Sequence, residues 1–121
     1  MHPVGPETRI IPMVGHPIVQ LKSLAPINAC MMPMDVAPPR IAAFFDCVRG
    51  WRNCIGVSVT LPHKQAAFAA CDKLSRRAAI ARAANIVRRE ADGTLYGDMT
   101  DGVAFCREIA RKGVNVRGCS F

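Results

Sequence analysis

The sequence predicts an α/β fold, a three-layer sandwich built around a mixed, mostly parallel sheet. Short apolar runs rich in β-branched residues alternate with segments whose apolar residues recur every three or four positions, as strands and helices respectively do. A late Asp-Gly pair between two short apolar runs adds a hairpin, and therefore an antiparallel pairing, to this sheet. With 121 residues, half of them hydrophobic, the chain is long enough for one domain with a real core.

The first half of the chain is expected to hold two strands and a helix. The elements are a strand over 9–14, a loop over 18–26, a strand over 29–36 and a helix over 38–48. Pro33 has no backbone donor, so the second strand belongs at a sheet edge or a bulge. Ile41, Phe44 and Val48 recur at helical spacing, and Gly50 is a plausible stop.

The second half predicts the rest of the sheet and three helices. The strands cover 55–61, 84–88 and 94–96, and the helices cover 64–71, 75–81 and 102–111. The run over 55–61 is nearly all apolar, as a parallel strand buried on both faces should be. Ser75 is a possible N-cap, Asp92 and Gly93 form the hairpin turn, and Gly113 ends the last helix.

The charge of the chain favours an anionic small-molecule ligand over nucleic acid. Sixteen basic residues against nine acidic ones give a net charge of +7. The basic residues are scattered, with short pairs at 76–77, 88–89 and 111–112, and no run of them alternates with aromatic residues. A nucleic-acid interface needs a contiguous basic face, so we expect only a generally basic surface near an anionic substrate or cofactor.

The six cysteines and the amino terminus help to predict the cellular compartment of the protein. By count, a secreted disulfide framework is one alternative. However, no pair has CxxC spacing, MHPVGPETR contains no apolar signal segment, and no run approaches the length of a transmembrane helix. We therefore expect a cytoplasmic protein with free, mostly buried thiols and no membrane association. The three histidines are too dispersed to suggest a metal site.

Polar residues gather at the ends of the expected strands. They are Thr60, His63, Lys64, Asn85, Thr100 and Asp101. Because ligands of open α/β sheets sit outside the carboxyl ends of the strands, these residues could meet in one cleft. A lysine and an aspartate there can shuttle the proton that leaves when an alcohol is oxidised. Taken singly, Lys64 is most simply a solvated lysine at a helix start and Asp101 most simply an N-cap.

Four stretches, in order over residues 14–105, resemble motifs of the shikimate dehydrogenases. GVSVTLPHK resembles N-V-T-x-P-x-K, RAANIV resembles G-A-V-N-T-V, and YGDMTDGVAF resembles G-x-N-T-D-G-x-G-F. The opening VGHPIVQLKS is similar to G-x-P-[IV]-x-x-S-x-S. The resemblance is to the N-terminal, substrate-binding domain of that family.

The resemblance implies a reaction and a set of roles. The reaction is the reversible reduction of 3-dehydroshikimate to shikimate by NADPH. Lys64 would be the catalytic lysine and Asp101 its acid–base partner, whereas His63, common at that place in relatives, would not be catalytic. The substrate's hydroxyls and carboxylate would be bound by Ser23, Thr60 and Asn85, with Gln20 as a further donor.

Several positions depart from the family's pattern and put the exact substrate in question. The first serine of the S-x-S pair is Leu21, the asparagine before V-T is Ser58, the threonine after Asn85 is Ile86, the glycine before Ala83 is Arg82, and the asparagine of N-T-D is Met99. The catalytic pair is kept, but part of the substrate shell is not. A related hydroaromatic acid such as quinate is therefore a candidate substrate.

Two segments that the family carries are missing from the sequence. A helix of roughly a dozen residues, ~18 Å long, is absent between the serine motif and the second strand. The sequence also has no G-x-G-x-x-[GA], so NADP or NAD would be held by a domain not present in this chain. Residues 1–121 are thus expected to be a substrate-binding domain that stops just before a dinucleotide-binding domain. The alternative is a non-catalytic small-molecule-binding module, and the oligomeric state is left as monomer or homodimer.

Overall fold

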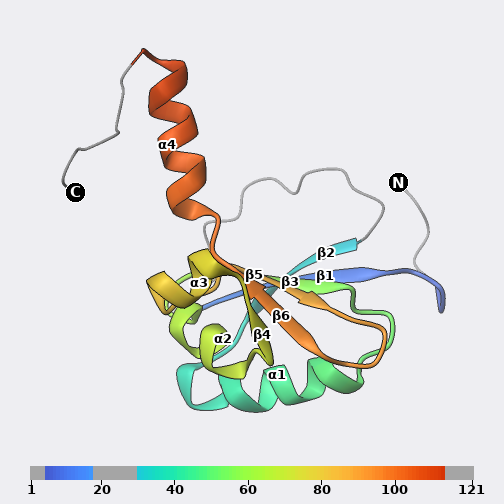
Figure 1. The fold of residues 1–121 in the computed structure, drawn as a ribbon. Helices are drawn as coiled ribbons and strands as arrows, with labels where there is room; N and C mark the ends of the chain where they lie inside the picture. Colours follow the sequence, from blue (N-terminus) through green and yellow to red (C-terminus); the bar gives the residue numbers. More distant parts are fainter. Residues whose placement is uncertain (1–4, 18–29, 114–121) are drawn as a thin grey trace.

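The structure, a computed structural model, describes residues 5–17 and 30–113 (Figure 1). In chain order its elements are β1 (Ile10–Gly15), β2 (Cys30–Asp35), the short 3-10 helix η1 (Pro38–Arg40), α1 (Ile41–Gly50), β3 (Gly56–Val59), α2 (Lys64–Ala70), β4 (Lys73–Leu74), α3 (Arg76–Ala81), β5 (Ile86–Arg89), β6 (Leu95–Asp98) and α4 (Asp101–Arg111). The loop expected over 18–26 lies outside the described residues. Within these ranges, no helix combines the length and apolarity needed to span a membrane.

The six strands form one mixed sheet in the order β2-β1-β3-β5-β6-β4. The pairs β1–β2, β1–β3 and β4–β6 are parallel, whereas β5 is antiparallel to both β3 and β6. Thus β5 alone runs against the other five strands, which confirms the predicted α/β class and its mixed, mostly parallel sheet. The carboxyl ends of the five parallel strands all point to one edge, which is called the carboxyl edge below.

The hydrophobic core lies between the sheet and the helices α1 and α2, which Figure 1 shows together below the sheet. Helix α1 contributes Ile41, Phe45 and Val48, whose spacing places them on one face. The register aligns Val57 of β3 with Val87 of β5, and both are buried in this core. The helices that join the core therefore share one face of the sheet, and the third layer of the expected sandwich stays a prediction.

The expected strands are present with shifted ends, and one strand was missed. β2 lies at the edge of the sheet, as Pro33 predicted. The third strand ends at Val59, two residues earlier than expected, because the chain turns there: the His63 N–H donates to the Thr60 carbonyl at 3.0 Å. The two-residue β4 is too short to show an alternating pattern, so only its pairing with β6 reveals it.

Helix α1 extends through Gly50, past its expected end at Val48, because an arginine from the sheet binds its last turn. The Arg89 side chain donates to the carbonyl oxygens of Val48 (2.8 Å) and Arg49 (2.7 Å). The Val48 carbonyl also accepts from the Trp51 N–H at 3.0 Å, and a cation is favourable at a helix carboxyl end. β5 and α1 are thereby joined across 41 and 40 positions of sequence.

The predicted hairpin between β5 and β6 turns at Asp92 and Gly93. The Asp92 carboxylate accepts from the Thr94 N–H at 2.9 Å, and the Gly93 N–H donates to the Glu90 carbonyl at 3.0 Å. Gly93 has φ of 91°, a conformation that side chains disfavour. A Cβ atom there would also lie 2.7 Å from the Arg49 carbonyl oxygen. Both the dihedral angle and the space require glycine.

We predict that Gly93→Ala lowers the free energy of unfolding by about 1–3 kcal/mol, because it adds dihedral strain and a backbone clash. The measurement is urea denaturation followed by circular dichroism. Gly50→Ala is the matched control, since Gly50 lies in α1 with no atom within 4 Å of its added Cβ. That control should be neutral or stabilising by about 0.5–1 kcal/mol. Equal stability of the two variants would contradict the constraint at Gly93.

Four cysteines of the described residues are free thiols, as the sequence predicted, whereas the expectation of mostly buried thiols is wrong for these four, since only Cys54 is fully buried. They are Cys47, Cys54, Cys71 and Cys106. Burial, together with the negative charge of Asp72, raises the pKa of the Cys71 thiol to about 11. Burial also raises the pKa of Cys54, whereas Cys47 is exposed. Because the thiolate is the reactive form, Cys54 and Cys71 should be slow nucleophiles.

Alkylation by iodoacetamide at pH 8 should therefore modify Cys47 well before Cys71, as followed by peptide mass spectrometry. Raising the pH toward 11 should accelerate the reaction at Cys71, since its thiolate fraction grows as the pH approaches its pKa. Faster labelling of Cys71 than of Cys47 at pH 8 would show that the Cys71 thiol is not held in its neutral form.

Candidate functional site

The turn that follows β3 delivers Lys64 to the carboxyl edge of the sheet. The Thr60 N–H donates to the Val14 carbonyl of β1 at 2.9 Å, which extends the β1–β3 pairing to the last residue before the turn. The turn then closes through the hydrogen bond from His63 to Thr60, and Lys64 begins α2. The Lys64 side chain is 24% exposed, so its stem is covered while solvent still reaches it.

His63 anchors this turn and takes no part in the charged cluster. Its imidazole is 1% exposed and forms a hydrogen bond through Nε2 to the carbonyl oxygen of Val36, at 2.6 Å. The Val36 N–H in turn donates to the Gly15 carbonyl of β1. The ring thereby ties the start of α2 to the ends of β1 and β2. The expectation that His63 is not catalytic stays a prediction.

Asn85 lies at the same edge because it precedes the one reversed strand. Its N–H donates to the carbonyl of Asp98 at the end of β6, at 3.0 Å, and its carbonyl accepts from the Val59 N–H at the end of β3, at 2.8 Å. Asn85 is thus held from both neighbouring strands. The sequence placed it inside a strand, whereas β5 begins one residue later, at Ile86.

The side chains of Lys64, Asn85 and Asp101 converge on one carboxylate. Lys64 Nζ donates to Asp101 Oδ2 at 2.5 Å, and Asn85 Nδ2 donates to Asp101 Oδ1 at 2.7 Å. Asn85 also bonds Thr100, whose N–H donates to Asn85 Oδ1 at 2.9 Å. The contact between Lys64 and Asp101 that the sequence predicted, across 37 positions, is therefore present.

This arrangement can bind an oxygen atom and move a proton. The Lys64 ammonium has three N–H donors, of which Asp101 takes one, so others can meet a hydroxyl or carbonyl oxygen. The Asp101 side chain is 46% exposed and lies in the first turn of α4, where the helix dipole favours a negative charge. Asn85 fixes the orientation of that carboxylate, and a ligand can approach both charged groups from solvent.

The remaining expected site residues stand apart from this cluster. Thr60 is exposed at the same edge, and within the described ranges its hydroxyl has no hydrogen bond to Lys64, Asn85 or Asp101. Ser23 and Gln20 lie outside the described residues. Their roles, and that of Thr60, therefore stay predictions.

Two features of the edge were not among the predicted site residues. Thr100 was noted as polar but was given no role, although it is bonded to Asn85 through both its N–H and its hydroxyl. His16, which follows β1, and Asp35, the last residue of β2, form a 2.7 Å contact between Nδ1 and a carboxylate oxygen. The sequence could have predicted this second pair, because His16 and Asp35 lie at the carboxyl ends of two parallel strands, and such ends meet at one edge of a sheet.

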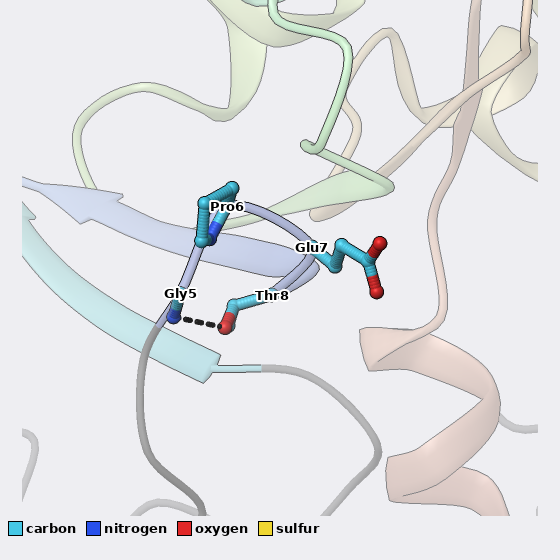
Figure 2. Close-up of a pocket in the computed structure, with 4 residues that line it drawn as sticks. All are labelled: Gly5, Pro6, Glu7 and Thr8. Carbon is cyan, nitrogen blue, oxygen red and sulfur yellow. Dashed lines mark hydrogen bonds between the residues drawn. The ribbon is translucent and has the colours of Figure 1, made fainter.

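A hollow among the described residues lies away from this cluster. It has a volume of about 520 Å³ and is lined by Gly5, Pro6, Glu7 and Thr8, which precede β1 (Figure 2). Those residues lie at the amino end of β1, the opposite edge from Lys64, so we give this hollow no part in the site. Across residues 5–17 and 30–113, no three metal-ligating side chains come together.

Known protein families match the part of the chain that holds most of these residues. A family model described as "Shikimate dehydrogenase substrate binding domain" matches residues 14–87, a range that includes Thr60, Lys64 and Asn85. The chain belongs to this family. The resemblance read from the four sequence motifs is thereby confirmed, and the ordered pattern of short motifs proved a sufficient signal.

Individual relatives match most of this chain. Shikimate dehydrogenase (NADP(+)) of Rubrobacter xylanophilus is 35% identical over 93% of the chain and 42% of its own length, and that of Methanopyrus kandleri is 34% identical over 88% and 39%. Shikimate 5-dehydrogenase of Thermus thermophilus, solved in complex with shikimate, is 27% identical with a TM-score of 0.75, covering 92% of this chain and 45% of its own. The chain therefore spans about two fifths of the length of the curated relatives that it matches.

We predict that Asn85→Ala lowers the free energy of unfolding by about 1–3 kcal/mol, because it leaves the Thr100 N–H and an Asp101 oxygen without their partner. Denaturation in urea measures the effect. Asn53→Ala is the control, since among the described residues Asn53 makes one side-chain bond, to the Thr8 carbonyl at 2.9 Å, whose loss should cost about 0.5–1.5 kcal/mol. A smaller loss at Asn85 than at Asn53 would argue against a shared network at the carboxyl edge.

Proposed function

We propose that this chain is the substrate-binding and catalytic half of a shikimate dehydrogenase-like oxidoreductase. The whole protein would interconvert 3-dehydroshikimate and shikimate, or a related hydroaromatic acid such as quinate, with NADP or NAD. The observation that carries the proposal is the Lys64–Asp101 pair, held by Asn85, at the carboxyl edge of a chain that belongs to this family. Residues 1–121 would form the substrate-binding domain, with the dinucleotide bound by another domain.

Lys64 and Asp101 would manage the proton of the reaction. Oxidation of an alcohol removes the hydroxyl proton along with a hydride, and reduction of the ketone requires a proton on the developing alkoxide. In the reducing direction, the Lys64 ammonium donates a hydrogen bond and then its proton to the carbonyl oxygen. Asp101, bonded to Lys64 at 2.5 Å, orients the ammonium and exchanges protons with solvent through its exposed carboxylate. In the oxidising direction the same groups act in reverse.

The substrate's other polar groups would be bound by neutral side chains around this pair. Thr60 and Asn85 lie at the same edge and can bond ring hydroxyls, and Ser23 and Gln20 are the candidates for the carboxylate. Leu21, where the family has a serine, removes one donor at the carboxylate end. A charged group that loses one hydrogen bond binds about ten- to a hundredfold more weakly. This loss is the reason to keep quinate and similar acids beside shikimate.

The residues of this chain do not fit the dinucleotide itself. A dinucleotide cradle requires a glycine-rich turn between a strand and a helix, so that the backbone can approach the pyrophosphate. In the described ranges, the turns after β3 and β6 read TLPH and MT, with no glycine. We therefore assign the NADP or NAD to a domain outside this chain and derive no step through it.

The proposed reaction implies the ligand, the pathway and the cellular compartment of the protein. The partner is a small anionic acid, which the net charge of +7 suits, and no nucleic acid or membrane is invoked. The enzyme would serve the shikimate pathway of aromatic amino acid biosynthesis in the cytoplasm, where its thiols stay reduced. Its oligomeric state would be monomer or homodimer.

The test is Lys64→Met in the complete protein, assayed for oxidation of shikimate and of quinate with NADP⁺ and with NAD⁺. We predict a fall in kcat of about 10²–10⁴-fold with a smaller change in KM, because proton transfer acts in the transition state. Lys73→Met is the control: Lys73 is an exposed lysine in β4, and its loss should leave both constants unchanged.

An unchanged kcat in Lys64→Met would overturn the catalytic role of Lys64. If the native protein binds shikimate or quinate in calorimetry but oxidises neither with either cofactor, the chain instead serves as a non-catalytic binding module. Turnover of quinate alone would place the substrate difference at the carboxylate end, where Leu21 replaces the serine.

A further inference from the structure

We propose that Asp98 is a positioning residue for the proposed catalytic pair, acting through the end of β6 on Asn85 and Asp101. The inference rests on the proposed function, because the pair that it positions is the proposed proton-transfer pair. Among the described residues, the Asp98 side chain has no hydrogen bond to Lys64 or Asp101, and it was not among the site residues that the sequence predicted.

The Asp98 carboxylate accepts four hydrogen bonds. Its Oδ1 accepts from Ser75 Oγ at 2.6 Å, from Arg77 Nε at 3.1 Å and from the Met99 N–H at 2.7 Å, and its Oδ2 accepts from Arg77 Nη2 at 2.5 Å. The side chain is 21% exposed, so these bonds are partly shielded from water. A two-pronged arginine contact holds a carboxylate in one orientation. The last residue of β6 is therefore fixed in place by its own side chain.

The side-chain donors, Ser75 and Arg77, come from the start of α3, which is itself attached to β6. Ser75 is the N-cap of α3: its Oγ accepts from the Ala78 N–H at 3.1 Å while its hydroxyl donates to Asp98. The Ser75 N–H also donates to the Gly97 carbonyl at 2.9 Å. Loss of the Asp98 carboxylate would therefore loosen the attachment of α3 to the end of β6.

The end of β6 controls the position of Asp101 in two ways. The Asp98 carbonyl accepts from the Asn85 N–H at 3.0 Å, and Asn85 Nδ2 bonds the Asp101 carboxylate. Thr100, between Asp98 and Asp101 in the chain, donates its N–H to Asn85 Oδ1. A shift of residues 98–100 would thus move Asn85 and Asp101 together relative to Lys64. Misplacement by about 1 Å can lower a rate on the order of a hundredfold.

The carboxylate is suited to this role at neutral pH. The Arg77 guanidinium, and then the Ser75 hydroxyl, hold the pKa of Asp98 below its ordinary value. A carboxyl with a lowered folded-state pKa contributes stability above its unfolded value, and that contribution is lost as the pH falls through the folded-state pKa. Asp98 is therefore charged, and its contacts are intact, across the range in which the reaction would be assayed.

The chain offers a matched control at the other end of the same strand. Asp72 Oδ2 accepts from Arg49 Nη1 at 2.5 Å and from the Leu95 N–H at 2.9 Å, at the start of β6. Like Asp98, it is an aspartate that joins an arginine to the backbone of β6, and its pKa is lowered, first by Arg49. It lies at the amino end of the strand, and its side chain has no bond to the Asn85 cluster among the described residues.

The experiment compares Asp98→Ala, Asp98→Asn and Asp72→Ala in the complete protein. We expect Asp98→Ala to lower kcat for shikimate about 10- to 100-fold with little change in KM, since it disturbs groups that act in the transition state. Asp98→Asn should recover part of the rate, because its amide oxygen can still accept from Ser75 and from the Met99 N–H. Asp72→Ala should lose stability and keep its kcat.

A second readout needs no turnover. Lysine acetylation by an N-hydroxysuccinimide ester, resolved by peptide mass spectrometry, reports how firmly Lys64 is held by Asp101. The Lys64 rate, taken relative to exposed Lys73, should rise several-fold in Asp98→Ala, less in Asp98→Asn, and not in Asp72→Ala. If the native protein oxidises no hydroaromatic acid, the proposed function fails, whereas this rate still decides whether Asp98 positions the pair.

Unchanged kcat and an unchanged relative rate at Lys64 in folded Asp98→Ala would overturn the inference. Equal losses of kcat in Asp98→Ala and Asp72→Ala would also overturn it, because the effect would then follow general stability and not the contact with the site. If Asp98→Ala does not fold, the same comparison is made with Asp98→Asn and Asp72→Asn.

Discussion

The hydrogen bonds of Asn85 are the constraint on which the carboxyl edge depends. Its backbone joins Val59 at the end of β3 to Asp98 at the end of β6, and its side chain bonds Thr100 and Asp101. One residue thus holds two strands and the first turn of α4 in register. Lys64 is fixed to the same place, because its carbonyl accepts from the N–H of Ala84, the residue before Asn85, at 3.0 Å.

The reversed direction of β5 explains how this residue reaches the edge. Five strands of the sheet point their carboxyl ends there, and β5, which is antiparallel to both neighbours, contributes its amino end instead. A parallel strand in this place would carry Asn85 to the opposite edge. The hairpin turn at Gly93, with φ of 91°, makes the second antiparallel pairing possible, so a turn at one end of the sheet supports the cluster at the other.

The positions that depart from the family's motifs differ in their effect on the backbone. Arg82 stands where the family has glycine, and it adopts φ of 53° at the C-cap of α3, a conformation that disfavours side chains by about 1–2 kcal/mol. The fold therefore keeps the backbone that glycine would adopt freely. Met99, in contrast, lies between Asp98 and Thr100 and keeps its backbone bond to the Asp98 carboxylate. This backbone bond does not require the asparagine side chain that the family has at that place.

The sequence by itself determined the local elements and the family. Alternating and helical periodicities predicted most strands and helices, Pro33 predicted an edge strand, Ser75 an N-cap, and Asp92 with Gly93 a hairpin, because each of these depends on neighbours within a few positions. Lys64 and Asp101 were paired from motif resemblance, since the spacing of 37 positions carries no geometry. The early end of β3 was missed, because apolar Leu61 extends the pattern into the turn.

Only the tertiary structure decided the hydrogen bonds of Asp98 and Arg89. Asp98 and Arg77 are 21 positions apart, and Arg89 reaches the last turn of α1 across 41 positions, so neither contact leaves a local pattern. The strand β4 exists only through its pairing with β6. Local propensity fixes which segments are strands and helices, whereas the direction of β5 in the assembled sheet decides that Asn85, Lys64 and Asp101 meet. That direction depends on contacts between distant segments, which no single stretch of sequence contains.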